Sequence, residues 1–214
     1  MTKYTKPVMG CYLLMGTAFT DNEKVLIREK LHRVAQECLQ QYGIKKTTVD
    51  QIVREVGISK GSFYNFYPGK EILFFVVLEE YQKSLIERLS KELEVAPRID
   101  PDIFSAAIFK LYRSLKESFV ITIIKNRELD YLMRKLPPEL IADHHSLDEL
   151  LLEQVFSYLR PPKNISTDVI AAALRALFMI LIHAEEVGEE YMDQVLQLLT
   201  QGLAQQIISG DVLP

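Results

Sequence analysis

The spacing of apolar residues along the chain predicts a protein built of helices. Val49, Ile52, Val53 and Val56 recur every three to four residues and share one face of a helix over residues 49–56. Stripes of the same period cover approximately residues 21–42, 70–95, 103–126, 147–158, 167–187 and 191–208. With short helices at 60–65 and 128–135, the pattern predicts an all-α fold of about nine helices.

Local signals indicate two short helices joined by a tight turn. Thr48 and Gln51 have the spacing of a capping box, as Thr20 and Glu23 do at the first helix. Gly57 stands where a left-handed residue is favoured at a helix end. Ser59 can cap the next helix. Two short helices joined by such a turn form the helix-turn-helix of DNA-binding proteins.

The second short helix carries side chains suited to DNA contact. Donors to phosphates or base edges stand at four of its positions, Lys60, Ser62, Tyr64 and Asn65. Gly61 has no side chain, so DNA could approach the backbone closely there. The aromatic run could instead be only a small hydrophobic core. We expect both, with Phe63 and Tyr67 pointing inward and Tyr64 outward.

Positive charge is concentrated in the N-terminal third. The net charge is −4, yet residues 1–70 hold eleven Lys or Arg and six Asp or Glu, and the remainder holds fourteen and twenty-three. A basic end on an acidic body is typical of nucleic-acid binding at that end. Lys70 opens a helix, where the helix dipole disfavours a cation. This placement suggests a nearby anion such as a DNA phosphate, with a solvated lysine as the alternative.

Residues 48–73 resemble the N-terminal DNA-binding domain of the TetR family of transcriptional regulators. The family pattern is matched in step at Thr48, Val49, Ile52, Gly57, Ile58, Ser59, Gly61, Ser62, Phe63, Tyr64, Lys70, Glu71 and Leu73. The resemblance implies that Thr48 and Tyr64 bind phosphates and that Lys70 holds the DNA backbone. It also implies that residues 60–65 meet the major groove. The expected DNA contacts are Lys46, Thr48, Ser59, Lys60, Gly61, Ser62, Tyr64, Asn65 and Lys70.

Four positions depart from the family pattern. Val53 and Val56 stand where alanine is usual, so the spacing of the helices is expected to differ slightly. Phe66 replaces the usual Tyr or His, which removes one expected phosphate contact. Tyr67 replaces the usual Phe, a small change for a residue that packs inward.

The pattern divides the chain into four parts. We expect an N-terminal arm over 1–20, a helix-turn-helix domain over 21–70, a connecting helix over 71–96, and a ligand-binding and dimerisation domain over 97–214. The last two helices are more apolar than one protomer needs, which predicts a homodimer. The resemblance agrees, because this family dimerises through its last two helices. The expected interface residues are Leu174, Leu177, Leu181, Val195, Leu196, Leu199 and Leu203.

The C-terminal part also offers candidates for a small-molecule pocket. They are aromatic and aliphatic residues with few polar groups, namely Phe104, Ile108, Tyr112, Leu115, Phe119, Tyr131, Phe156, Phe178, Met179 and His183. Such a lining would suit a largely apolar ligand. The alternative is that the same stripes are ordinary core.

The cysteines and the N-terminus bear on the cellular compartment. Cys11 and Cys38 suggest neither a disulfide framework nor a zinc site, which fits a reducing cytoplasm. Lys3 and Lys6 precede an apolar run that loosely imitates a signal peptide. That run is too short to span a bilayer, and a DNA-binding helix follows it, so we do not expect export.

No recognised catalytic motif occurs in the sequence. Phosphate-binding glycine loops and the H-E-x-x-H motif are absent, and His144–His145 suit an exposed helix start better than a metal site. We therefore expect a non-enzyme without cofactor or metal. The predicted function is a repressor that binds a palindromic operator as a dimer and is released by a small apolar ligand. The alternatives are the same fold switched by a protein partner and, more remotely, an all-helical enzyme.

Overall fold

The computed structural model describes residues 19–96, 98–142 and 165–209 of the 214-residue chain. Its N-terminal helices are α1 (Asp21–Lys46), α2 (Val49–Val56) and α3 (Lys60–Phe66), followed by the long α4 (Lys70–Glu94). The body comprises α5 (Pro101–Lys116), α6 (Phe119–Lys125), α7 (Leu129–Met133), α9 (Thr167–Ile182), α10 (Ala184–Val187) and α11 (Met192–Ala204). A 3-10 turn, η2 (Glu189–Tyr191), precedes α11, and a π-helical turn, η3 (Gln205–Ser209), follows it. The described residues contain no strand, which confirms the all-α prediction.

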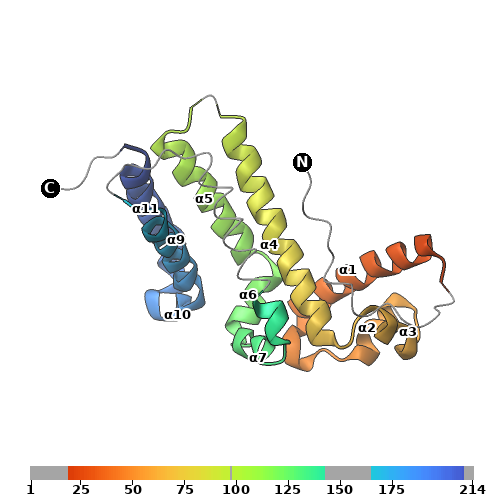
Figure 1. Ribbon diagram of the computed structural model, residues 1–214. Coiled ribbons are helices and arrows are strands. Elements are labelled where there is room, and N and C mark those ends of the chain that lie inside the picture. Colours follow the sequence, from red (N-terminus) through yellow and green to blue (C-terminus); the bar gives the residue numbers. More distant parts are fainter. Residues whose placement is uncertain (1–18, 97, 143–164, 210–214) are drawn as a thin grey trace.

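The long helix α4 organises the arrangement of the others (Figure 1). Its first turns lie beside the group formed by α1, α2 and α3, and α5 runs along its later turns. Helices α9 and α11 pack on the far side of α5, and α6 and α7 lie against α1. The N-terminal helices and the body are therefore connected by α4 itself, with no separate linker between them.

The capping signals in the sequence are confirmed. Thr20 and Thr48 each form a complete capping box, with Glu23 and Gln51 respectively. Gly57 adopts a left-handed φ of +80°, and its N–H donates to the Val53 carbonyl at 2.8 Å. The Ser59 hydroxyl accepts from the N–H of Ser62 at 3.0 Å and so begins α3. These local interactions stabilise the helix-turn-helix.

One predicted helix is divided in the structure. The single helix expected over 103–126 is interrupted, because the Ser118 hydroxyl accepts from the Val120 N–H at 3.2 Å and donates to the Leu115 carbonyl at 2.8 Å. The first helix is broken at Gly43, directly after the expected end at residue 42, and a further helical turn follows the break to Lys46. The arm over 1–18 and the predicted helix over 147–158 lie outside the described residues.

The buried side chains form two clusters that α4 joins. The first cluster contains residues of α1, α2, α3, the first half of α4, α6 and α7. The second contains residues of the second half of α4, α5, α9 and α11. Tyr81 and Val120 pack against both. The packing thus places α6 and α7 with the N-terminal helices, and the domain boundaries given above remain a prediction.

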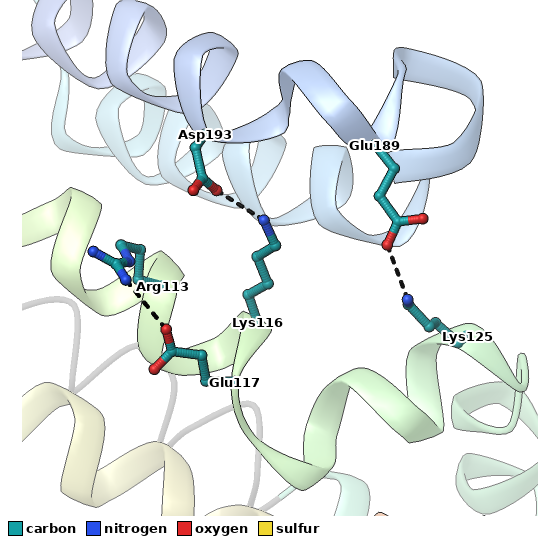
Figure 2. Close-up of polar contacts among 6 residues, drawn as sticks. All are labelled: Arg113, Lys116, Glu117, Lys125, Glu189 and Asp193. Atoms are coloured by element: carbon teal, nitrogen blue, oxygen red, sulfur yellow. Dashed lines mark hydrogen bonds and ion pairs between the residues drawn. The ribbon is translucent and has the colours of Figure 1, made fainter.

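Ion pairs fasten the C-terminal helices to the body (Figure 2). The Lys116 ammonium on α5 lies 2.8 Å from the carboxylate of Asp193 on α11, and that of Lys125 on α6 lies 2.9 Å from Glu189 in η2. The Lys125 ammonium lowers the pKa of Glu189 below its usual range. These pairs are exposed to solvent, so they orient the segment but add little to its stability.

A buried carboxylate joins the turn between α6 and α7 to the end of α1. Glu128 is 3% exposed, and its carboxylate accepts hydrogen bonds from the backbone N–H groups of Ile44 and Lys45. Those N–H groups are available because Gly43 breaks the helix with φ +76° and ψ −173°, a conformation open almost only to glycine. A Cβ at this position would lie 2.5 Å from Glu128 Oε2 and 2.7 Å from Asn126 Nδ2. Gly43 therefore permits both the break and the close approach of Glu128.

We predict that Gly43→Ala lowers the free energy of unfolding by about 2 kcal/mol or more, because it combines backbone strain with a steric overlap. Chemical denaturation of the full chain measures this. Gly202→Ala is the matched control: no atom lies within 4 Å of a Cβ there, and the change should raise stability by about 0.5–1 kcal/mol. Equal stability of the Gly43→Ala variant and the wild type would contradict the role given to this residue.

Candidate nucleic-acid interface and cavity

Helix α3 presents polar side chains to solvent and anchors itself with aromatic ones. Lys60, Gly61 and Asn65 are exposed, and the Tyr64 side chain is 50% exposed. Phe63 and Tyr67 are buried, as the sequence predicted. Ser62 is half-buried, and Ser59 is exposed at the helix start. The predicted DNA-contact residues of this helix therefore lie together on one accessible face.

A polar chain behind α3 fixes its orientation. The Tyr67 hydroxyl and the His32 Nε2 atom form a hydrogen bond, and His32 Nδ1 lies 2.7 Å from the Glu80 carboxylate. Burial raises the pKa of Tyr67 to about 12, so its hydroxyl keeps its proton at neutral pH. These three residues belong to the end of α3, to α1 and to α4. The exposed face of α3 is thus held against the two longer helices.

Several cations near this face already have partners. The Lys60 ammonium lies 3.0 Å from the Asp50 carboxylate, which raises the pKa of Lys60. Lys30 donates to the Val56 carbonyl at 2.6 Å and so caps the end of α2. Lys46 is exposed and has no side-chain partner among the described residues. Thr48 is exposed too, with its hydroxyl in the α2 capping box. Lys46 is therefore a cation that DNA could reach at no cost to another contact.

Lys70 has a structural partner that the sequence did not suggest. Its ammonium donates to the carbonyls of Ile44 at 2.8 Å and Thr47 at 2.6 Å. The carbonyls at a helix end carry partial negative charge, so a cation there is favourable. The carbonyl groups at the end of α1 thus supply the partial negative charge that offsets the unfavourable position of Lys70 at the start of α4. A phosphate contact at Lys70 remains a prediction.

An apolar cavity of about 440 Å³ lies where the two buried clusters meet. Its walls come from α4, α5, α6, α7 and α9. Four predicted pocket residues line it, namely Ile108, Tyr112, Leu115 and Phe178. None of the other lining residues was predicted for the pocket, namely Phe75, Leu78, Glu79, Tyr81, Gln82, Leu85, Ile86, Leu89, Leu111, Val120, Ile123, Ile124, Leu129, Leu132, Met133, Leu174 and Arg175. The run of apolar residues over 72–78, which covers every side of α4 there, was the one signal that could have placed this helix in the wall.

The other predicted pocket residues lie elsewhere. Phe104 and Phe119 are core residues of the second and first cluster respectively. Tyr131 donates to Glu71 at 3.3 Å near the start of α4. Met179 and His183 are exposed, so neither belongs to the cavity wall. Phe156 lies outside the described residues.

The tyrosine hydroxyls at the cavity are already hydrogen-bonded to the protein. Tyr112 donates to the Leu174 carbonyl at 2.8 Å, and Tyr81 donates to the Ser114 carbonyl at 2.9 Å. Burial raises the pKa of Tyr112. Because both hydroxyls already donate to backbone carbonyls of neighbouring helices, neither has its proton available for a hydrogen bond to a ligand.

The residues predicted for a dimer interface divide into two groups. Leu177, Leu181 and Leu196 are buried inside the protomer, so they cannot offer their area to a partner. Leu174, Val195 and Leu203 are half-buried, and Leu199 is 39% exposed. Three exposed apolar residues that were not among the predicted interface residues join this second group on α9 and α11, namely Val169, Met179 and Leu198.

Other kinds of site are not evident in the described part of the chain. Within it, no three His, Cys, Asp or Glu side chains are placed to hold a metal ion. Among the helices described, none has the length and apolar character needed to cross a membrane. His144 and His145 lie outside the described residues.

Comparisons with known proteins agree with this geometry. The model of the family "Bacterial regulatory proteins, tetR family" matches residues 31–77, which include all of α2 and α3. YerO of Bacillus subtilis, an uncharacterised HTH-type transcriptional regulator, is 23% identical over 209 residues, covering 89% of this chain and 71% of YerO.

Solved structures show the same fold along most of the chain. A transcriptional regulator from Cytophaga hutchinsonii has a TM-score of 0.62 at 22% identity, covering 87% of this chain and 99% of that one. FadR from Bacillus subtilis in complex with stearoyl-CoA has a TM-score of 0.63 at 14% identity, covering 86% and 99%.

The exposed face of α3, its capped turn and the basic N-terminal third define a helix-turn-helix transcriptional regulator. The family match to residues 31–77 shows that this part of the chain is the helix-turn-helix segment of the TetR family of regulators.

We predict different outcomes for two lysines near the DNA face. Lys46→Ala should make the salt dependence of DNA binding shallower by about one unit and leave folding unchanged, because its side chain has no partner among the described residues. Lys70→Ala should lower the free energy of unfolding by about 1.5–3 kcal/mol, since it removes charged hydrogen bonds to carbonyls. Salt titrations and denaturation measure both. If Lys70→Ala leaves the salt dependence of DNA binding unchanged, Lys70 does not contact a phosphate and its role is only to cap α1.

Proposed function

We propose that the protein is a repressor that binds a palindromic operator as a homodimer and leaves it when a small, largely apolar ligand enters the cavity. The observation that carries this proposal is the position of the cavity between the two buried clusters. One of those clusters contains the core of the helix-turn-helix. A ligand in the cavity therefore contacts side chains that pack directly against the DNA-binding helices.

The path from cavity to DNA face is short. Ile123 and Leu132 line the cavity and also belong to the first cluster. Between them along the chain stands Glu128, whose carboxylate binds the end of α1. A ligand that displaces α6 and α7 would move this attachment, and Lys70 ties the start of α4 to the same place. The ligand must bind the DNA-incompetent form more tightly for this to release DNA.

The chemistry of the cavity supports an apolar ligand. Its size falls within the range of small-molecule sites, and its lining is almost entirely aliphatic and aromatic. The stearoyl-CoA bound to Bacillus subtilis FadR shows that a regulator of this fold can hold a ligand with a long apolar chain. We further propose that the protein acts in the cytoplasm and as a regulator rather than an enzyme. The same fold switched by a protein partner remains the second candidate.

We predict that filling the cavity abolishes the response to ligand. Ile86 is half-buried on α4 and lines the cavity, so Ile86→Trp should occupy part of its volume. The operator is first obtained by selection from random DNA, and apolar compounds are screened by thermal shift. A saturating ligand should weaken operator binding of the wild type by about 5- to 150-fold and of Ile86→Trp by less than twofold.

Val95→Trp is the matched control, because Val95 is highly exposed at the end of α4 and away from the cavity. It should respond as the wild type does. A ligand that stabilises the wild type strongly but leaves its operator affinity unchanged would refute release by ligand. DNA binding itself would then stand, and switching by a protein partner would become the better proposal.

We predict that Leu199→Glu produces monomers with weak operator binding, because a buried unpaired charge opposes association. Val95→Glu, a charge on an exposed apolar residue outside α9 and α11, should remain dimeric. Sedimentation at micromolar concentration measures both. The selected operator should be an inverted repeat with half-sites roughly 34–36 Å apart, or a multiple of that spacing. A monomeric wild type would contradict the assembly.

A further inference from the structure

One cation stands on the wall of the apolar cavity. Among the lining residues that the structure describes, Arg175 is the only Lys or Arg, and it is the only charged residue in the apolar sequence stretch 169–182. It follows Leu174 and precedes Phe178 by one turn of α9, and both of these neighbours line the cavity as well. Its side chain is exposed, so its charge is hydrated while its stem borders the cavity.

Arg175 also differs from most other cations of the body. Five of those form ion pairs with carboxylates, namely Lys110, Arg113, Lys116, Lys125 and Arg127, and Figure 2 shows three of these pairs. The Arg175 guanidinium has no hydrogen-bond or ion-pair partner among the described residues. Among the polar groups of the lining, the hydroxyls of Tyr81 and Tyr112 are bonded to carbonyls. Glu79 and Gln82 are likewise engaged. A polar group of a ligand would therefore find its available partner at Arg175.

We propose that the cavity binds an aliphatic anion, with its chain among the apolar side chains and its charged head on the Arg175 guanidinium. This rests on the cavity being the ligand site of the proposed function. A guanidinium offers a carboxylate two parallel N–H donors, which an alcohol cannot use fully. A cationic ligand would be repelled there. The Glu79 carboxylate on α4 is the one other charged group among the described lining residues, and its repulsion would keep an anionic head on the α9 side of the cavity.

The volume limits the length of the chain. At roughly 30 Å³ per non-hydrogen atom, the share of a water molecule in the liquid, about 440 Å³ holds on the order of 15 such atoms. A saturated carboxylate of about ten to twelve carbons fits this estimate. The anionic group could be a free carboxylate at the end of the chain. It could instead be a phosphate of a larger carrier that is attached to the chain and remains outside the cavity. Both share an apolar chain and an anionic group.

The test compares matched probes on the full-length protein. Decanoate, 1-decanol and decylammonium, kept below micelle formation, compete with the neutral dye Nile red. We expect decanoate to bind wild type more tightly than the other two. Arg175→Gln should weaken decanoate binding about 5- to 10-fold and change 1-decanol binding by less than twofold. Arg175→Lys should recover part of the loss, and added salt should shrink the difference.

Lys91→Gln is the control for loss of a surface charge. Lys91 is exposed on α4, lies outside the cavity wall, and has no side-chain partner among the described residues. This variant should bind decanoate as the wild type does. Decanoyl-CoA distinguishes the two sources of the anion. If it binds more tightly than decanoate and depends on Arg175 in the same way, the ligand carries the larger phosphate-bearing group. If it binds more weakly than decanoate, the ligand is the free carboxylate.

The outcomes separate this inference from the proposed function. Equal decanoate affinity of the wild type and Arg175→Gln overturns the inference, as does a failure of decanoate to bind. Release of operator DNA by 1-decanol would then still support the proposed function. Conversely, Arg175-dependent decanoate binding that leaves operator affinity unchanged supports the anion site and refutes release by ligand.

Discussion

The structure depends on one buried carboxylate, because Glu128 connects the body to the end of the first helix. A buried charge is tolerated only when hydrogen bonds replace its lost hydration, and here two backbone N–H groups supply them. Gly43 makes the arrangement possible by leaving those groups without partners inside α1 and by carrying no side chain. The DNA-binding helices are therefore attached to α6 and α7 as well as to α4.

Lysines perform a second structural task at the same end of the molecule. Lys30 caps α2 and Lys70 caps α1, each by donating to backbone carbonyls at a helix end. The surplus of positive charge in residues 1–70 includes these two cations and Lys60, which pairs with Asp50. The charge available to DNA is accordingly smaller than the composition indicates. Lys46, by contrast, offers its whole charge to solvent.

The sequence predicts best those structural features that depend on residues close together along the chain. The capping boxes, the left-handed Gly57 and the inward Phe63 follow from interactions within a few positions of the chain, and all are confirmed. The Glu128 contact joins residues 84 positions apart, so no local pattern could reveal it. Most of the cavity wall was missed for a similar reason. The early turns of α4 are apolar on every side, and only the packing of α6 and α7 decides which side faces the cavity.

The same reasoning explains the C-terminal helices. A helical stripe shows that Leu177, Leu181 and Leu196 are buried, but not whether the covering surface belongs to the same protomer. The structure assigns them to the core of one protomer. Arg175, in contrast, was evident in the sequence as an interruption of an apolar helix, and the structure adds that it borders a cavity.

The continuity of α4 through both buried clusters has a consequence for the way the protein unfolds. Leu73 and Phe74 belong to one cluster and Leu85 and Leu89 to the other, all on a single helix. Neither cluster can melt without freeing half of that helix, so the two should lose their structure in one cooperative transition. Under the proposed function, a ligand bound between them would stabilise the whole molecule by mass action, including the DNA-binding helices that the ligand would not touch. In such a protein, release from DNA need not involve any loosening of the fold: the complex that leaves the operator can be the more rigid one.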